Sequence, residues 1–425
     1  MWDKFVQKMR VVLEDEQLRT RILFVLAALV VFRFLAVIPI PGVDEAALQG
    51  FLAKTPLVGL LDVFSGGGFS SVSIMMLGVG PFITASIVMQ LMTILIPRLK
   101  EMYQEEGDAG RQRFMQYSRY LSVPLAFIQA FSFLFLLQQN GSITSITFLQ
   151  MFTNVCIIAA GSVLLMWIGE LISEFGVGNG VSLIIFAGIV SSIPSSLSQF
   201  IFTFDITQLP AYVGFAAAAL FIMAGVVFIT EAERPIPVTY ARRVRGMKVM
   251  GGVSTYLPLR VNQAGVIPII FALSILLFPQ MIATFLSKSA IAIVATSASF
   301  VVGALANQWV YGALYFFFVV VFTYFYTAIT FDPKEIAKNL QRSGGFIPGI
   351  RPGDPSGDYL SKLTRRITLF GALFLGLVAI LPNVTQLITG VQILTIGGTA
   401  LLIVVSVALE TVKQIDSQLV MREYE

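Results

Sequence analysis

DVFSGGGFSS, residues 62–71, stands a short way after one apolar run and directly before another, residues 72–96. Three consecutive glycines lower helix stability by roughly 1 kcal/mol each, so this stretch is a poor candidate for a helix that crosses a bilayer. It nevertheless carries only one charge and two phenylalanines, which is unusual for a loop in water. A flexible, partly apolar segment therefore lies at the mouth of a predicted membrane span.

The composition around this stretch is that of a membrane protein. Of the 425 residues 56% are hydrophobic and 12% charged, about half the charged fraction of a soluble chain. There is no histidine, which excludes Ser-His triads, HExxH zinc sites and histidine proton relays. The single cysteine, Cys156, lies in an apolar run and cannot form a disulfide within the chain. We expect no enzyme activity, no metal site and no cofactor.

Ten apolar stretches have about the 20 residues that a helix needs to cross a bilayer. They predict an all-α polytopic protein, with an amphipathic helix in the first twenty residues lying at the membrane surface. The stretches are found near residues 22–38, 72–96, 117–137, 151–172, 181–202, 211–230, 265–286, 311–331, 367–381 and 393–409.

The basic residues predict the orientation of these spans. If the N-terminus is cytoplasmic, the inside segments are the N-terminal arm, residues 98–119, 232–261 and 332–366, and the tail, which together hold 25 of the 28 lysines and arginines. This asymmetry follows the positive-inside rule and places both termini in the cytoplasm. Ten spans divide into halves of five, residues 1–205 and 206–425, which permits an inverted repeat with a site between the halves.

Charged residues at the middle of a span usually mark ion or proton coupling, and no Asp, Glu, Lys or Arg lies near a predicted midplane. This weakens an inverted-repeat secondary solute transporter, which stays the alternative function. The lack of histidine and of paired acids at the midplane also argues against an intramembrane enzyme.

Two cytoplasmic loops are unusually long. Residues 231–262 are rich in Val, Thr and Tyr and predict a basic hairpin that reaches out of the membrane. In residues 332–366, Pro333 begins a predicted short helix, and FIPGIRPG forms a turn that displays Arg351. Basic loops can simply obey the orientation rule, or they can dock an acidic or nucleic-acid partner. Their length favours docking.

The second span has a two-sided character. Gly78, Gly80 and Pro81 weaken its outer third, and Val79, Ile83, Ser86 and Gln90 share one helical face. That face is apolar at one end and polar at the other. Ordinary helix packing explains it, and so does a helix that lines a path with a narrow apolar middle.

Five stretches of the chain resemble, in order, signature stretches of the bacterial SecY family of protein-conducting channels. They are GPFITASIVMQL, GVGNGVSLIIFAGIV, NQAGVIPIIFA, GGFIPGIRPG and GGTALLIVVSVALE. The resemblance spans nearly the whole chain and implies two clamshell halves of five spans around an hourglass pore. It also implies that a re-entrant segment near residues 60–73 plugs the outer funnel, with plug residues Asp62, Phe64, Gly66, Gly67, Gly68 and Phe69. A plain external loop is the other interpretation of that segment.

The resemblance also implies roles for other residues. An aliphatic pore ring falls on Val79, Ile83, Ile185, Ile270 and Ile403. A lateral gate, through which a signal helix passes into lipid, falls on Thr84, Gln90, Asn179 and Asn262. Partner docking falls on Arg242, Arg243, Arg245, Lys248 and Arg351. Pro235 departs from the family, where a basic residue is expected.

The implied function is passage of unfolded polypeptide across, or laterally into, the plasma membrane. The implied partners are the small membrane subunits SecE and SecG, the SecA motor ATPase, the ribosome, an unfolded preprotein with its signal sequence, and the lipid bilayer.

Overall fold

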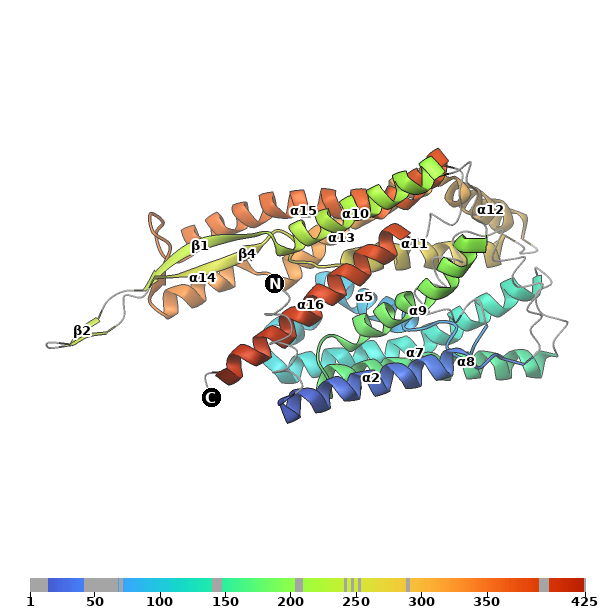
Figure 1. Ribbon diagram of the computed structural model, residues 1–425, viewed down its shortest axis with the longest axis horizontal. Helices are drawn as coiled ribbons and strands as arrows, with labels where there is room; N and C mark the ends of the chain where they lie inside the picture. The colour runs from blue at the N-terminus through green and yellow to red at the C-terminus, as the bar shows by residue number, and fades with distance from the viewer. Residues whose placement is uncertain are drawn as a thin grey trace.

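The computed structural model describes residues 14–41, 68, 72–139, 147–202, 209–240, 243–245, 248–250, 254–287, 291–389 and 397–423. Most of them are helical, and the long helices run roughly along one axis of the molecule (Figure 1). A helix coincides with each of the ten predicted spans, which confirms the all-α polytopic architecture. These helices are α2 (Glu16–Ala36), α5 (Gly80–Leu95), α7 (Gly107–Gln139), α8 (Phe148–Phe175), α9 (Gly180–Phe202), α10 (Leu209–Glu231), α11 (Ile267–Leu286), α13 (Gln308–Thr330), α15 (Asp354–Thr389) and α16 (Gly397–Glu423).

Length and apolarity of the described residues single out five stretches that could cross a membrane unaided, in α7, α8, α10, α13 and α15. A sixth is formed by α5 together with α6 (Pro97–Gln104), which are bent against each other by 112°. The bend falls where Pro97 begins the second helix, because proline cannot continue the hydrogen-bond ladder of the first.

The helices differ from the sequence prediction in two places. An apolar helix that was not predicted, α12 (Ala292–Ala306), lies between α11 and α13. Its 15 residues are too few for a scan that seeks about 20. In addition, α15 begins at Asp354, so the end of the predicted loop 332–366 is helical. A hydropathy scan detects only the apolar part of a helix that continues through polar residues.

The two long loops form one small unit, here called the two-loop unit. Strand β1 (Glu233–Tyr240) pairs antiparallel with β4 (Ser254–Arg260), which confirms the predicted hairpin, and β5 (Gly345–Phe346) joins the other edge of β1. A two-stranded ribbon, β2 (Arg243–Arg245) and β3 (Lys248–Met250), lies beyond it. The predicted short helix is α14 (Pro333–Arg342), capped by the Asp332 carboxylate, which accepts from the Lys334 N–H at 2.9 Å.

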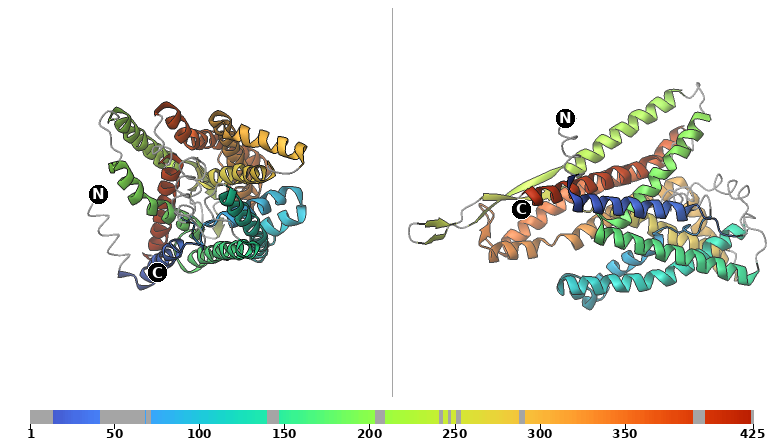
Figure 2. Two further views of the ribbon diagram at one scale, coloured as in Figure 1. Left: turned by 90° about the vertical axis from the view of Figure 1, so that its right-hand side faces the viewer. Right: turned by 60° about the horizontal axis from the view of Figure 1, so that its bottom comes forward.

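The two predicted halves meet along their inner helices. In Figure 1, α10, α13 and α15 form the upper edge, α2, α7 and α8 the lower edge, and α5, α11 and α16 lie between them. Across the halves α11 contacts α5 and α7, and α16 contacts α9. The view along the long axis shows helices of both halves around a common interior (Figure 2, left). One buried apolar cluster contains residues from both halves.

Candidate functional site

The five predicted ring residues meet in one apolar cluster. Val79 directly precedes α5 and Ile83 lies in its first turn. The other three come from different helices, Ile185 from α9, Ile270 from α11 and Ile403 from α16. Four of the five are at most 8% exposed, and Ile83 is partly buried against the same cluster. A packed core and a closed constriction are equally dry, so the gating role of these residues stays a prediction.

The predicted second span, residues 72–96, is helical only from Gly80 to Leu95. Residues 72–79 follow turns, and α5 begins at Gly80. The sequence explains this boundary: Gly78 adopts a φ of 57°, which glycine reaches without steric cost, and Pro81 lies in the first helical turn, where no N–H is needed. The glycines and the proline predicted a weakened helix in the first third of this span. In the structure, residues 72–79 are not helical at all.

Only one predicted plug residue belongs to the part of the chain that the structure describes. The Gly68 carbonyl accepts a hydrogen bond from the Ser73 N–H at 2.9 Å. The position is buried, and a side chain at Gly68 would approach the Met75 carbonyl to 3.0 Å. Outside the described residues lie Asp62, Phe64, Gly66, Gly67 and Phe69.

Two predicted gate residues carry buried polar atoms, Gln90 on α5 of the first half and Asn262 in the segment before α11 of the second. Within the described residues, neither Oε1 of Gln90 on α5 nor Oδ1 of Asn262 before α11 has a hydrogen-bond partner. The Asn262 Nδ2 donates to the Gly265 carbonyl at 3.2 Å. An unsatisfied buried acceptor costs about 1–3 kcal/mol, and its persistence calls for an explanation in function or hydration.

The other two predicted gate residues have local partners. The Thr84 hydroxyl donates to the Gly80 carbonyl of its own helix at 3.0 Å. The Asn179 side-chain oxygen accepts from the Ser182 N–H at 3.2 Å, so Asn179 caps the start of α9. These contacts give both residues a structural role, and their place in a gate stays a prediction.

The two-loop unit has a hydrophobic core of its own. Its buried members are Ile236 of β1, Leu259 of β4, Ile347 after β5 and Leu360 of α15. Side chains from both long loops therefore pack together, and the position of one loop depends on the other. The sequence alone predicts two separate docking elements, because 69 residues lie between the two loops in the chain.

Arg351 is exposed on a turn that its neighbours fix. Gly349 and Gly353 have φ angles of 83° and 93°, which other residues rarely adopt. The Ser356 hydroxyl donates to the Arg351 carbonyl at 2.8 Å, so the backbone is held while the guanidinium faces solvent. The remaining basic docking residues lie on the ribbon that projects farthest from the helices (Figure 1), namely Arg243, Arg245 and Lys248, and Arg242 lies outside the described residues.

The departure at Pro235 has a structural explanation. Pro235 lies directly opposite Pro258 in the β1–β4 ladder. Neither residue has an N–H, so this pair occupies a position at which neither partner donates across the ladder. At such a position an N–H group would point away from the partner strand, toward the outer edge of the hairpin, and proline leaves that edge without a donor. On the β1 side β5 pairs only with Thr239 and Tyr240, and Pro235 blunts the edge that is left uncovered.

Two ion pairs were not predicted from the sequence. Lys413 of α16 lies 2.8 Å from Glu231 at the end of α10, beside the base of the hairpin. Arg119 of α7 bonds Glu170 of α8 at 2.5 Å, and the Glu170 side chain is 15% exposed. Each residue by itself resembles an ordinary charge at the end of a span. Only the adjacency of the helices pairs them, and no sequence signal gives that adjacency.

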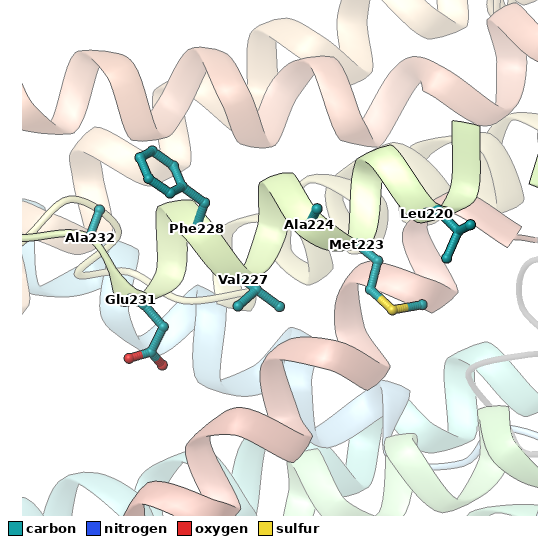
Figure 3. Close-up of a pocket in the computed structure, with 7 residues that line it drawn as sticks. All are labelled: Leu220, Met223, Ala224, Val227, Phe228, Glu231 and Ala232. Carbon is teal, nitrogen blue, oxygen red and sulfur yellow. The ribbon is translucent and has the colours of Figure 1, made fainter. Parts of the chain in front are cut away.

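An open apolar groove of about 740 Å³ lies along α10 (Figure 3). Met223, Val227 and Glu231 point to the same side of the helix in this view. The most apolar 18-residue window of α10 is only 12% buried, the lowest share among the five span candidates. The full lining is Leu220, Met223, Ala224, Val227, Phe228, Glu231 and Ala232.

Comparison with known proteins places this arrangement in a family. The SecY family model matches residues 73–412. The protein translocase subunit SecY of Mycobacterium tuberculosis is 43% identical over 446 residues, which cover 100% of this chain and 99% of that protein. The SecY subunit of Thermus thermophilus is 42% identical over 430 residues, covering 97% and 95%.

Solved structures share the fold at lower sequence identity. A protein-conducting channel superposes with a TM-score of 0.63 at 19% identity, covering 95% of this chain and 93% of that one. A SecY channel whose plug domain stabilises the closed state gives a TM-score of 0.64, also at 19% identity and with the same coverage. Sec61 from a canine ribosome-channel complex gives 0.60 at 17% identity, again covering 95% and 93%.

Proposed function

We infer the roles of these residues from one premise: the chain belongs to the SecY family and is a subunit of a protein-conducting translocation channel in a membrane. This assignment excludes an enzyme, and it decides against the solute transporter that the sequence left open. The family alone does not say which side chains of this chain gate the channel or which surfaces bind its partners.

We propose that Val79, Ile83, Ile185, Ile270 and Ile403 close the channel at rest. The observation that carries this proposal is their origin: four separate segments from both halves deliver branched aliphatic side chains into one dry cluster. Such a ring excludes water and ions by dewetting, and rotation of its side chains admits an extended chain. Residues 60–73 plug the channel on the side away from the cytoplasm.

The lateral gate in this proposal lies between α5 and α7 of the first half and α11 and α13 of the second. Across this seam α11 contacts both α5 and α7. The amide oxygens of Gln90 and Asn262 lack hydrogen-bond partners among the described residues, and we propose that both are solvated when this seam opens. An apolar signal helix that separates α5 from α11 then gains lipid contact on one side. Thr84 and Asn179 belong to the proposed gate by family resemblance alone.

The proposed docking surface is the two-loop unit with its exposed Arg351 and the basic ribbon, and we place this unit on the cytoplasmic side. Displayed cations attract acidic protein or nucleic acid. Two of the solved structures that share this fold are of ribosome-bound complexes, one of Sec61 and one of Ssh1. We propose the SecA motor and the ribosome as the partners here. The shared core of Ile236, Leu259, Ile347 and Leu360 presents both loops to a partner as one body.

The exposed face of α10 is the proposed seat of a small membrane subunit such as SecE, with SecG as a further subunit. An apolar helix face that leaves an open groove offers packing to a single transmembrane helix, whereas lipid fills such a groove less closely.

Both termini are proposed to face the cytoplasm of the plasma membrane, and residues 1–205 and 206–425 to act as the two moving halves. In support, the first turn of α2 and the last turn of α16 lie at the end of the molecule from which the basic hairpin projects (Figure 1).

A trapped translocation intermediate tests the ring. Single cysteines at Ile83 and Ile403 are placed in a Cys156→Ser background, and a preprotein carrying one mid-chain cysteine is arrested during export. We expect disulfide cross-links at both ring positions. A cysteine at Phe221, which is 82% exposed on α10, is the matched control and should not cross-link. Equal cross-linking at all three positions, or none at the ring, contradicts the proposal.

A further inference from the structure

The turn segment 72–79, which ends in the ring residue Val79, is held from outside by the chain before it. The Ile40 N–H donates to the Val72 carbonyl at 3.0 Å, and the Ile74 N–H donates to the Ile38 carbonyl at 3.0 Å. These bonds flank an antiparallel bridge between Pro39 and Ser73. A short two-stranded contact therefore fixes the beginning of the segment.

Helix α8 fixes the rest of it through two adjacent residues. A Cβ atom at Gly161 would lie 2.0 Å from the Ile74 carbonyl oxygen, so only glycine permits this approach of backbone to helix. The next residue, Ser162, is 3% exposed, and its hydroxyl donates to the Gly78 carbonyl at 2.9 Å. Ser162 thus holds the peptide that immediately precedes Val79.

The shape of the segment is imposed by these neighbours. Val72 has a φ of 41°, a left-handed conformation that is rare for a β-branched side chain, and it is fully buried. Such a conformation persists only where the surroundings over-determine it. Within residues 72–79 the backbone forms only single turns, in which Met76 N–H donates to Ser73 and Gly78 N–H to Met75. The bridge to residues 38–40 and the contacts with α8 add the constraint that a continuous helix would otherwise supply.

We propose that Gly161 and Ser162 are positioning residues: they hold residues 72–79 as a fixed frame that sets Val79 in the ring, and this frame stays in place when the channel opens. The inference rests on the proposed gating role of the ring. It adds that α8 determines where the constriction closes, although α8 contributes no side chain to the ring.

The first test compares two hydroxyl deletions on the same helix. Ser162→Ala removes the bond to Gly78, whereas Thr153→Ala removes an exposed hydroxyl that bonds only within α8, to Leu149. Both variants are reconstituted in lipid vesicles, and resting ion conductance is measured per inserted molecule. Loss of one hydrogen bond makes displaced positions of the frame about fivefold more populated, and in the closed channel each of these leaves Val79 out of the ring. Ser162→Ala should therefore conduct about five times more than wild type, with Thr153→Ala within about twofold.

Gly161→Ala should have a larger effect in the same direction, because the added methyl group displaces the Ile74 carbonyl. If Ser162→Ala conducts no more than Thr153→Ala, or only lowers abundance, the positioning role is wrong. Normalising conductance to inserted protein separates the two readouts.

The second test asks whether the frame moves. Pro39→Cys and Ser73→Cys in a Cys156→Ser background face each other across a bridge of the close, non-hydrogen-bonded type, which suits a disulfide. Oxidised protein should export a preprotein at about the rate of the reduced protein. Export that stops on oxidation and returns with reductant overturns the fixed frame.

A cysteine at Val79 in the otherwise unaltered channel separates the two levels of inference. If it fails to cross-link to a trapped preprotein, the ring assignment fails and the positioning role fails with it. If it cross-links while Ser162→Ala behaves like Thr153→Ala, only the positioning role fails.

Discussion

Replacing Ile403 by asparagine distinguishes a gate from a packed core. Ile403 is 0% exposed on α16. Losing a buried isoleucine removes about 1.5–3 kcal/mol of apolar burial. A buried amide without a partner costs about a further 1–3 kcal/mol. In a core both terms reduce the stability of the folded protein, and Ile403→Asn should lose abundance.

In a gate the amide term falls mainly on the closed state, because the open state hydrates the side chain. A penalty of about 1–3 kcal/mol on the closed state changes the closed-to-open ratio by about fivefold to 150-fold. The channel then needs less help from a signal helix to open. Ile403→Asn should therefore be present at normal levels, leak ions and export preproteins with defective signal sequences.

The assay measures membrane abundance, ion conductance and export of a signal-defective reporter in the same cells. Leu402→Asn is a matched control, because Leu402 is also 0% exposed while its side chain points about 100° away around the helix. Leu402→Asn should lose abundance without relaxing the signal requirement. If both variants lose abundance alike and neither relaxes that requirement, Ile403 is a core residue and the ring assignment is wrong.

Three further predictions concern the plug and the two-loop unit. Deleting residues 62–71 should raise resting ion leak without abolishing export, and a cysteine at Phe69 should become accessible to labelling only when a preprotein is trapped; equal labelling in both states contradicts a plug. Arg351→Glu should sharply reduce SecA-dependent export at normal abundance, since repulsion replaces attraction at a displayed cation; unchanged export would leave the loop as an orientation signal only. Ile236→Ala should destabilise the two-loop unit by about 2–4 kcal/mol and lower SecA-dependent export without resting leak. Tyr256→Ala, at a side chain 66% exposed, should do neither. Leak in Ile236→Ala would show that the unit does not fold independently of the pore.

The sequence by itself predicted the span positions, the hairpin, the helix beginning at Pro333 and the family. These features depend on runs of neighbouring residues. About twenty apolar residues satisfy the thickness of a bilayer, and the glycines and the proline between residues 78 and 81 disfavour helix wherever the segment lies. Short α12 and the polar start of α15 were missed because a hydropathy window does not detect them. The predicted ring residues could be named only through family resemblance, since each alone reads as core packing.

The tertiary structure decided which distant residues meet. It joined the two long loops through one hydrophobic core, explained Pro235 by its partner Pro258, and paired Lys413 with Glu231. It also placed Gly161 and Ser162 of α8 against the segment that carries Val79. A glycine, a serine or a lone charge has the same local appearance with or without such a partner. Their roles depend on the packing of helices far apart in the chain, and local composition does not encode that adjacency.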